Sequence, residues 1–336
     1  DDYESLMDHC EPRVGDLVLS RNQSLGIASY IVSDEKFVLG QDTVLIQQKD
    51  VNGMLIFHRL QTSGTQNLIS RLSGGSTFSR INLKDIRLLP LALPKEKEEQ
   101  RKIADFLTAV DKRISQLSEK KALLATYKKG AMQQLFTQAF RFKDDHGNDF
   151  PDWEEKNLGE IGEVVGGGTP DSSNDSYWEG KVIWFTPSEI RSKYAANSYR
   201  TISEVGLIKS SASILPKGAL LLTSRATIAE VSIATKPCTT NQGFQSIIAN
   251  SGTNNEFLYY WILQSKKEFL RRAQGSTFLE IGGKEVRKIP IGVPSLPEQT
   301  KIADFLSTID RKIDSVAAQI TETQNFKRGL LQQMFV

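Results

Sequence analysis

The 336-residue chain lacks the features that mark several large protein classes. No apolar run approaches the roughly 18 residues that a membrane-spanning helix needs, and the acidic residues 1–4 do not resemble a signal peptide. The two cysteines, Cys10 and Cys238, stand without CxxC or Cys/His spacing, which indicates a reducing compartment and no zinc site. We therefore expect a cytoplasmic protein that does not enter a membrane and holds no metal.

The chain also lacks an excess of charge of either sign. Its 42 basic residues nearly cancel its 40 acidic residues, so the formal net charge is only +2. Any binding of nucleic acid must then come from local patches, since bulk charge does not predict it. Apolar residues make up 39% of the chain, which is ordinary for globular protein, and the length predicts two or more domains.

Catalytic motifs are equally scarce. His9, His58 and His146 are scattered singly, and we find no Walker A sequence and no methyltransferase motif. The glycines at 166–168 are followed by Thr169 and Pro170, where a phosphate-binding loop needs a helix start, so we expect a tight turn instead. We therefore expect a chain without catalytic residues and without a cofactor.

One pattern leaves a nuclease open as an alternative. Pro170-Asp171 followed by Glu179-Gly180-Lys181 fits the PD…ExK signature of Mg²⁺-dependent nucleases. Both carboxylates fall in a loop rich in Ser, Asn and Gly, whereas the nuclease site needs them at strand ends. Chance occurrence is the favoured interpretation.

What the chain does contain is a duplication with a period of about 200 residues. Residues 75–78 (Gly-Ser-Thr-Phe) return at 275–278, residues 103–107 (Ile-Ala-Asp-Phe-Leu) at 302–306, and Gln133-Gln134 at Gln332-Gln333. Asp111 returns as Asp310. A repeat of this length predicts two similar halves that share one function.

The most regular part of each half predicts a long helix. Residues 98–138 contain no proline, and the copies of this stretch begin just after Pro94 and Pro297, which suits helix starts. Apolar residues recur every 3.5 residues on average over about five heptads, the signature of a coiled-coil seam. The stripe alone leaves parallel and antiparallel packing open. The seam residues are Ile103, Leu107, Val110, Ile114, Leu117, Ile302, Leu306, Ile309, Ile313 and Val316.

Lysines interrupt both seams. Lys121 and Lys128 in the first copy and Lys327 in the second occupy positions where a coiled coil prefers apolar groups. We expect their stems to splay so that the ammonium groups reach solvent. The alternatives are that they soften the pairing locally or receive the acidic groups of a partner.

The globular parts of the two halves match only in their later portions. Gly15 to Arg21 aligns with Gly218 to Arg225, which is one residue longer, while Gln41 aligns with Gln242 and Phe57 with Phe257. The second module also predicts strands at 181–185 and 219–223 and a helix over 256–273. Upstream of Gly15 the first module is about 50 residues shorter, so we expect it to lack its opening portion.

Basic and amide side chains in the modules are candidates for DNA contact, because they bind phosphates and base edges. A solvated surface explains any one of them equally well. The matched Arg21/Arg225 and Gln41/Gln242 pairs are the best supported. The candidates are Arg21, Asn22, Gln41, Arg80, Thr169, Thr186, Arg191, Lys193, Arg225 and Gln242; further basic residues are Arg87, Arg200, Lys209, Lys284 and Arg287.

The repeated Lys-Ile-Ala-Asp-Phe-Leu segment, with its upstream Glu-Gln and downstream Gln-Gln, resembles the DNA-specificity subunits of Type I restriction–modification enzymes. Residues 133–136, 141–144, 153, 158–161 and 167–170 extend the resemblance over nearly the whole chain. It implies α/β (α+β) target-recognition domains, two in tandem, joined by two long antiparallel coiled-coil helices. The expected boundaries are 1–94 and 153–294 for the two domains, 95–140 and 295–336 for the helices, and 141–152 for a linker.

The resemblance also implies a function and partners. Each domain would read one half of a split sequence in double-stranded DNA, while the helices would dock two methyltransferase (modification) subunits and motor-nuclease (restriction) subunits. S-adenosylmethionine and ATP would bind to those partners. A helical rod of roughly 55 Å would span about 15 base pairs, the scale of two half-sites and a spacer. The alternative is a coiled-coil scaffold that binds proteins and has no DNA specificity.

Overall fold

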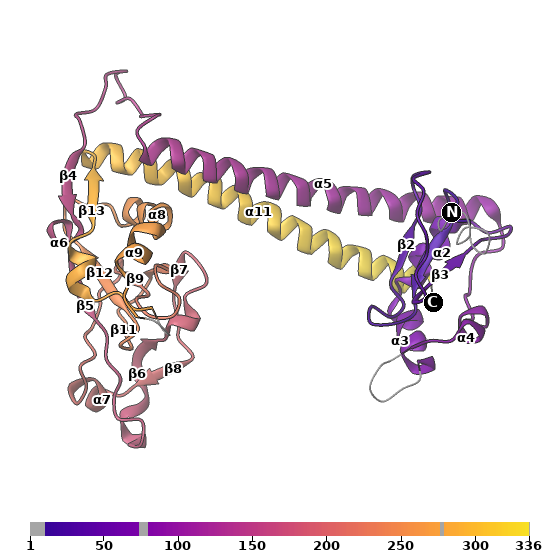
Figure 1. Cartoon of the computed structure of the whole chain (residues 1–336), viewed down its shortest axis with the longest axis horizontal. Helices are drawn as coiled ribbons and strands as arrows, with labels where there is room; N and C mark the ends of the chain where they lie inside the picture. The colour runs from indigo at the N-terminus through magenta and orange to yellow at the C-terminus, as the bar shows by residue number, and fades with distance from the viewer. Residues whose placement is uncertain (1–10, 74–79, 276–278, 336) are drawn as a thin grey trace. The chain divides into compact units, whose positions relative to one another are not determined.

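The computed structural model describes residues 11–73, 80–275 and 279–335 (Figure 1). The repeated residues 75–78 and 276–278, and also His9 and Cys10, lie outside these ranges. The chain divides into two compact units. The first unit comprises Asp1–Leu123 and Ile313–Val336, and the second comprises Leu124–Lys312, so each takes part of both long helices.

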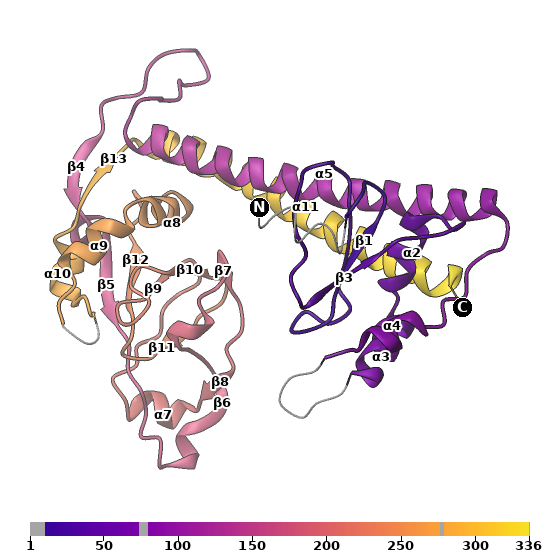
Figure 2. The same ribbon diagram turned by 45° about the vertical axis from the view of Figure 1, so that its right-hand side comes forward.

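The two long helices form as the heptad pattern predicts. Helix α5 spans Lys97–Phe136 and α11 spans Leu296–Met334, and they run side by side in both views (Figures 1 and 2). In the first unit Leu107 packs in one cluster with Leu331, and in the second unit Lys128 meets Asp310. Early residues of one helix thus meet late residues of the other, which confirms the antiparallel pairing.

The second unit is built on a five-stranded sheet in the order β5-β12-β9-β10-β7. Its central strands pair antiparallel, and β7 joins β10 parallel at one edge. A three-stranded sheet in the order β11-β6-β8 and a two-stranded pair of β13 with β4 complete the strands described in this unit. The strands are β4 Glu154–Asn157, β5 Gly162–Gly166, β6 Trp178–Phe185, β7 Tyr194–Ala195, β8 Arg200–Ile202, β9 Leu220–Leu222, β10 Val231–Ala234, β11 Thr239–Thr240, β12 Gln245–Ala249 and β13 Pro290–Val293.

The helices of the second unit are short. The helix expected over 256–273 is divided at Ser265 into α8 and α9, and five of the six residues from Phe257 to Ile262 are less than 7% exposed. Asn254 caps α8 by accepting hydrogen bonds from the backbone N–H groups of Glu256 and Phe257. The helices and 3-10 turns are α6 Leu158–Ile161, η1 Asp175–Tyr177, η2 Pro187–Glu189, α7 Glu204–Ile208, α8 Asn255–Gln264, α9 Lys266–Arg272 and α10 Gly283–Arg287.

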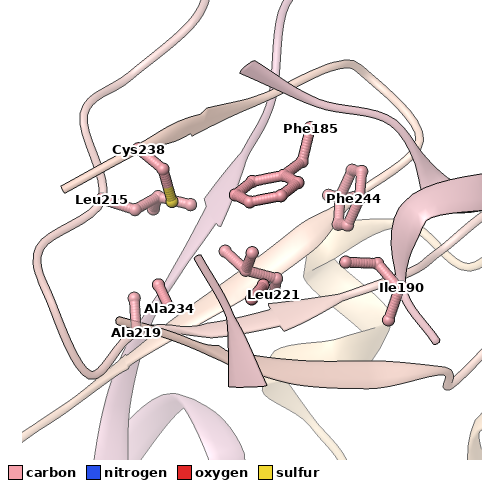
Figure 3. Close-up of a cluster of buried hydrophobic side chains, with 9 residues drawn as sticks. Phe185, Ile190, Leu215, Ala219, Leu221, Ala234, Cys238 and Phe244 are labelled. Atoms are coloured by element: carbon pink, nitrogen blue, oxygen red, sulfur yellow. The ribbon is translucent and has the colours of Figure 1, made fainter. Parts of the chain in front are cut away.

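The core of the second unit lies between its sheets. Phe185 of β6 and Leu221 of β9 are each 2% exposed or less and pack in one cluster with Phe244 (Figure 3). Cys238 lies in the same cluster, and burial raises the pKa of its thiol to about 12, so it is an unreactive core residue. This core holds the loops at the ends of β6 and β11 in fixed positions.

The first unit contains a smaller version of the same arrangement. Its sheet has the order β2-β1-β3, with all pairs antiparallel, and it packs on helices α2, α3 and α4. Among the described residues, no strand continues this sheet in the way that β5 and β7 continue the sheet of the second unit. The elements are β1 Leu17–Ser20, β2 Ala28–Tyr30, β3 Thr43–Ile46, α2 Gly53–Leu60, α3 Ser63–Leu72 and α4 Leu83–Arg87.

Backbone hydrogen bonds correct the alignment of the two halves. The N–H of Arg21 bonds to the carbonyl of Asp42, and the N–H of Ser224 bonds to that of Gly243, so Arg21 corresponds to Ser224. The expected match of Arg21 with Arg225, which required an inserted residue, is therefore wrong by one position. The same register pairs Gln41 with Gln242, as expected, and Asn22 with Arg225.

Helix caps correct a second match. The N–H groups of Asn52 and Asn254, which cap α2 and α8, donate to Gln100 and Gln299 at 3.0 and 2.8 Å. When the two caps are aligned, His58 is the equivalent of Tyr260. Matching Phe57 with Phe257 was therefore wrong by two positions. The repeated Glu-Gln at the start of each long helix thus has a structural reason, since its glutamine ties the helix to the cap of a neighbour.

The seam lysines are the clearest correction to the sequence analysis. Lys128 Nζ lies 2.6 Å from Asp310, and Lys327 Nζ lies 2.7 Å from Asp111. Their side chains are only 18% and 13% exposed, so the expectation that they reach solvent was wrong for both; Lys121 is exposed as expected. The acceptors are the repeated aspartates of the other helix. Each unit therefore contains one interhelical ion pair at equivalent positions.

None of the helices in the described ranges is long and apolar enough to cross a membrane.

Candidate nucleic-acid interface

A cluster of loops in the second unit gathers most of the candidate residues of that half. The glycine run after β5 lies against the segment that follows β11, where Gly168 donates a backbone hydrogen bond to Thr240. A Cβ on Gly167 would lie 1.9 Å from the carbonyl oxygen of Asn241, and a Cβ on Gly168 would lie 2.4 Å from Ala212 N. The glycines therefore serve close packing of backbones. The tight turn expected there is wrong, because Gly166 ends strand β5 and residues 167–170 form no turn.

Polar side chains project from these packed loops. Thr169 is exposed and donates a hydrogen bond to the exposed Gln242. Thr186 donates to the carboxylate of Glu189 through both its backbone N–H and its hydroxyl, each at 2.7 Å, which fixes the turn η2 after β6. Arg191 is exposed just beyond this turn, and its Nε donates to Ser188 O at 2.7 Å. The loops that follow β5, β6 and β11 thus carry Thr169, Thr186, Arg191 and Gln242.

Arg225 follows strand β9 and faces a carboxylate. Its guanidinium makes a two-pronged contact with Glu280 at 2.8–3.0 Å, and both side chains are more than 40% exposed. The corresponding residues of the first unit are Asn22 and Arg80, which form the equivalent backbone bridge. An arginine and a glutamate in one unit therefore replace an asparagine and an arginine in the other, so the two units present different chemistry at the same place.

In the first unit the candidates divide between internal contacts and the surface. Arg21 Nε donates to Ile81 O at 3.1 Å, an internal contact between segments 60 residues apart. Arg80 is half exposed, lies 3.6 Å from Asp42 and donates to the carbonyl of the exposed Gln41 at 3.4 Å. Gln41 and Arg80 are therefore the side chains of this unit that remain best placed for a ligand.

Lys193 lies inside the second unit. Its ammonium donates to Glu256, Tyr260 and Ser307 at 2.8–2.9 Å, and its side chain is 13% exposed. Burial acts to raise the pKa of Glu256, but the bonds from Lys193 and its neighbours outweigh it and lower that pKa. Lys193 thus fastens the loop before β7 to α8 and α11, and these contacts occupy its ammonium group.

The nuclease-like PD…ExK pattern at residues 170–181 does not form a metal site. Asp171 is bound within its own loop by Ser173, whose N–H and hydroxyl lie at 2.9 and 2.8 Å and lower the pKa of this carboxyl. No group of three or more His, Cys, Asp or Glu side chains that could hold a metal ion occurs in the part of the chain that the structure describes. The PD…ExK pattern therefore gains no support.

The residues predicted for the seam lie on one side of each helix. Leu107, Val110 and Leu117 of α5 are buried, and Ile302, Leu306, Ile309 and Val316 of α11 are buried as well. Ile103, Ile114 and Ile313 are partly exposed.

An aromatic cluster beside the loops was not among the sequence candidates. Trp178 and Trp184 of β6 are 8% and 4% exposed, and Arg200 stacks on Trp178 with its Cζ 3.6 Å from the ring centroid. Tyr199 stands next to it with 82% of its surface exposed. Trp184 lies in the strand predicted at 181–185, but the pairing of β6 with β8 was needed to bring Arg200 to the two tryptophans.

Comparisons with known proteins agree with this arrangement. The sequence model of the family described as "Type I restriction modification DNA specificity domain" matches residues 9–125 and again residues 151–324. The chain is 38% identical over 212 residues to the Type I restriction enzyme MjaIX specificity subunit of Methanocaldococcus jannaschii, covering 60% of this chain and 49% of the relative. It is 28% identical over 176 residues to the EcoR124I/EcoR124II specificity subunit of Escherichia coli, covering 50% and 43%. The chain thus spans about half the length of these relatives.

Solved structures agree at the level of the fold. The S subunit of a Type I restriction–modification system from M. genitalium superposes with a TM-score of 0.60 at 18% identity, covering 96% of this chain and 83% of that one.

Proposed function

Because the chain belongs to the Type I restriction–modification DNA specificity family, we propose that it reads a divided target in double-stranded DNA, with one module for each part. The observation that supports this most is the doubled match of the family to both halves of one chain. Two related modules on one helix pair fit a ligand that presents two recognition elements at a fixed distance.

The surface loops of the second unit support a reading function for that module. Threonine, glutamine and arginine side chains stand at the ends of segments whose backbones are packed closely together. Side chains held on rigid backbone contact base edges with less loss of conformational entropy than side chains on free loops. We propose that Thr169, Thr186, Arg191, Arg225 and Gln242 line the DNA-facing surface of this module, and that Gln41 and Arg80 do so in the first.

The helix pair is proposed to set the number of base pairs between the two parts of the DNA target. A helix of 40 residues extends about 60 Å at 1.5 Å per residue, or roughly 17 base pairs of B-DNA. The ion pairs Lys128–Asp310 and Lys327–Asp111 fix the register of the pairing, because a slip of one helix along the other leaves the four partly buried charges of these pairs without partners.

We further propose that the chain has no catalytic role and acts with two methyltransferase subunits and with motor-nuclease subunits. Two equivalent ends of one helix pair offer two equivalent docking places, which suits two copies of one partner. Cofactors for methyl transfer and for DNA translocation would then bind on those partners.

The alternative is a helical scaffold that binds proteins and does not discriminate DNA sequences. Its support is the near-neutral charge of the chain, which gives no bulk attraction to DNA. Selection of duplexes from a random library by the full chain, alone and with its methyltransferase partner, distinguishes the two. The proposal predicts an enriched motif and an affinity that falls steeply with salt; binding without enrichment would favour the scaffold.

A further inference from the structure

A hollow of about 570 Å³ in the second unit lies beside the loops proposed to face DNA. Its lining combines Trp178, Arg200 and Tyr199 with the carboxylates of Asp175 and Glu179. It adjoins the candidate loops directly, because Tyr199 N donates to Glu189 of the turn η2 at 2.7 Å. The question is what a surface of this composition recognises.

The floor of the hollow is rigid. Trp178 Nε1 donates to Asp171 O at 3.2 Å, and Trp184 Nε1 donates to Gly168 O at 2.8 Å. The two indoles meet edge to face, with ring centroids 5.1 Å apart. Hydrogen bonds and packing therefore fix both rings relative to the glycine segment after β5.

Arg200 is held on this floor with its donors unused. Its Cζ lies 3.6 Å from the Trp178 centroid and 5.9 Å from that of Trp184, so a stacked contact fixes the guanidinium plane. Within the described residues, no hydrogen bond or ion pair of this guanidinium to an acceptor is found, in contrast with Arg225 and its Glu280. A stacked arginine that keeps its donors free is prepared to bind a planar acceptor edge-on.

An irregularity in strand β6 also shapes the lining of the hollow. A bulge in β6 places both Trp178 and Val182 opposite Ile202, and Glu179 takes a positive φ of 57° within it. Gly180 permits this, because a Cβ there would lie 2.4 Å from Ile202 O. Glu179 of this bulge and Arg200 both line the hollow.

The charges favour a base edge over a phosphate as the occupant. Asp175 and Glu179 in the same lining repel the phosphate backbone, whereas a guanine presents two neutral acceptors, O6 and N7, to a guanidinium. A carboxylate in the same lining can accept a hydrogen bond from the amino group of the paired cytosine. On these grounds we infer that Arg200, stacked on Trp178, reads a guanine in the part of the target assigned to the second module. This inference rests on the proposed function and adds one specificity-determining residue to it.

Selection of duplexes from a random library by the full chain tests the inference, with Arg200→Lys compared with the parent protein. Lysine keeps the charge but cannot make the two-pronged contact, so the preference for guanine at one position should fall about tenfold or more while other positions keep theirs. Arg271→Lys, a matched change at an exposed arginine paired with Glu268 on α9, should leave every position unchanged. A thermal melt of each variant confirms folding.

A second readout uses the DNA. Replacing the selected guanine by 7-deazaguanine removes the N7 acceptor, which should weaken binding by the parent protein and have little further effect on Arg200→Lys. If Arg200→Lys keeps all base preferences while Arg200→Ala weakens binding to every sequence alike, Arg200 contacts a phosphate and the inference is wrong. A parent protein that enriches no motif contradicts the proposed function itself, which distinguishes the two failures.

Discussion

The two units attach to the helix pair with the same ion pair but with different neighbours. In the second unit Tyr260 donates to Asp310 at 2.5 Å and Lys128 pairs with the same carboxylate. In the first unit the equivalent residue is His58, whose Nδ1 lies 3.8 Å from Asp111 and has no hydrogen-bond partner although it is buried. Equivalent positions thus carry a satisfied network in one unit and a partly satisfied one in the other, so we expect unequal stability.

The sheets of the two units also differ, and the sheet of the second unit is the larger one. The second unit extends the shared three strands with β5 and β7, whereas the described part of the first unit shows the three strands alone. An internal duplication therefore preserves the attachment to the helices more closely than it preserves the globular module.

The largest expected effect is at the seam, where the units should behave alike. Leu107 and Leu306 are both fully buried, so changing either to Asp places an unpaired charge at a buried position and should lower the free energy of unfolding by about 4 kcal/mol or more. Leu123→Asp, at a leucine that is 62% exposed on the same helix, is the control and should have little effect. Ile313→Asp should cost less than Leu107→Asp, because Ile313 is only partly buried. Urea denaturation measures all four; full stability of Leu107→Asp would contradict the paired seam.

The next prediction concerns the two interhelical ion pairs, where the units should differ in how much stability a lost aspartate costs. Asp310→Asn should lower the free energy of unfolding by about 3 kcal/mol, because it leaves both Lys128 and Tyr260 without their charged acceptor. Asp111→Asn should cost only about half as much, since Lys327 keeps its bond to Gln61 at 2.6 Å. Denaturation curves of the two variants provide the comparison. Equal losses would show that the tyrosine and the histidine are interchangeable here.

Acid should weaken the first unit before the second. Burial first, and then the charge of Lys327, lower the pKa of His58 from its usual 6.5 to about 4, and Asp111 opposes this shift. The unfolded chain therefore binds a proton below pH 6.5 that the folded unit takes up only near pH 4, so stability is full above 6.5 and falls toward pH 4. The loss between pH 7 and pH 5 should be about 2 kcal/mol.

Hydrogen exchange resolved by unit measures this loss, and His58→Gln is the control that removes the titrating group. The pH dependence of the first unit should shrink in that variant, whatever its stability at pH 7. A slope that persists in His58→Gln would assign the acid sensitivity to other groups.

The smallest effect is expected at the surface pairs. Arg225→Ala should lower the free energy of unfolding by no more than about 1 kcal/mol, because its pair with Glu280 is exposed to solvent. Arg80→Ala should cost still less, since its distance to Asp42 is 3.6 Å. Thermal melts check both, and a loss of several kcal/mol in either variant would make that arginine a structural residue.

The sequence predicted the long helices closely, because a heptad stripe is a local pattern that packing alone makes stable. The stripe itself left the direction of pairing open, and only the family resemblance implied that it is antiparallel. The acceptors of Lys128 and Lys327 could not be predicted, since they lie about 200 residues away on the other helix. Alignment by residue identity misplaced Arg225 by one position, and only the backbone hydrogen bonds of the sheet resolved it. The stacked Arg200 was one of several basic residues in the sequence, because strand pairing creates its environment.

Mapping the methylated motifs in DNA from cells that carry this chain with the proposed methyltransferase partner tests the central claim most directly. Two reading modules on one helix pair predict a motif in two parts separated by a fixed number of unspecified base pairs, and Arg200→Lys should alter one part alone. A continuous motif, or methylation without any motif, would contradict the account.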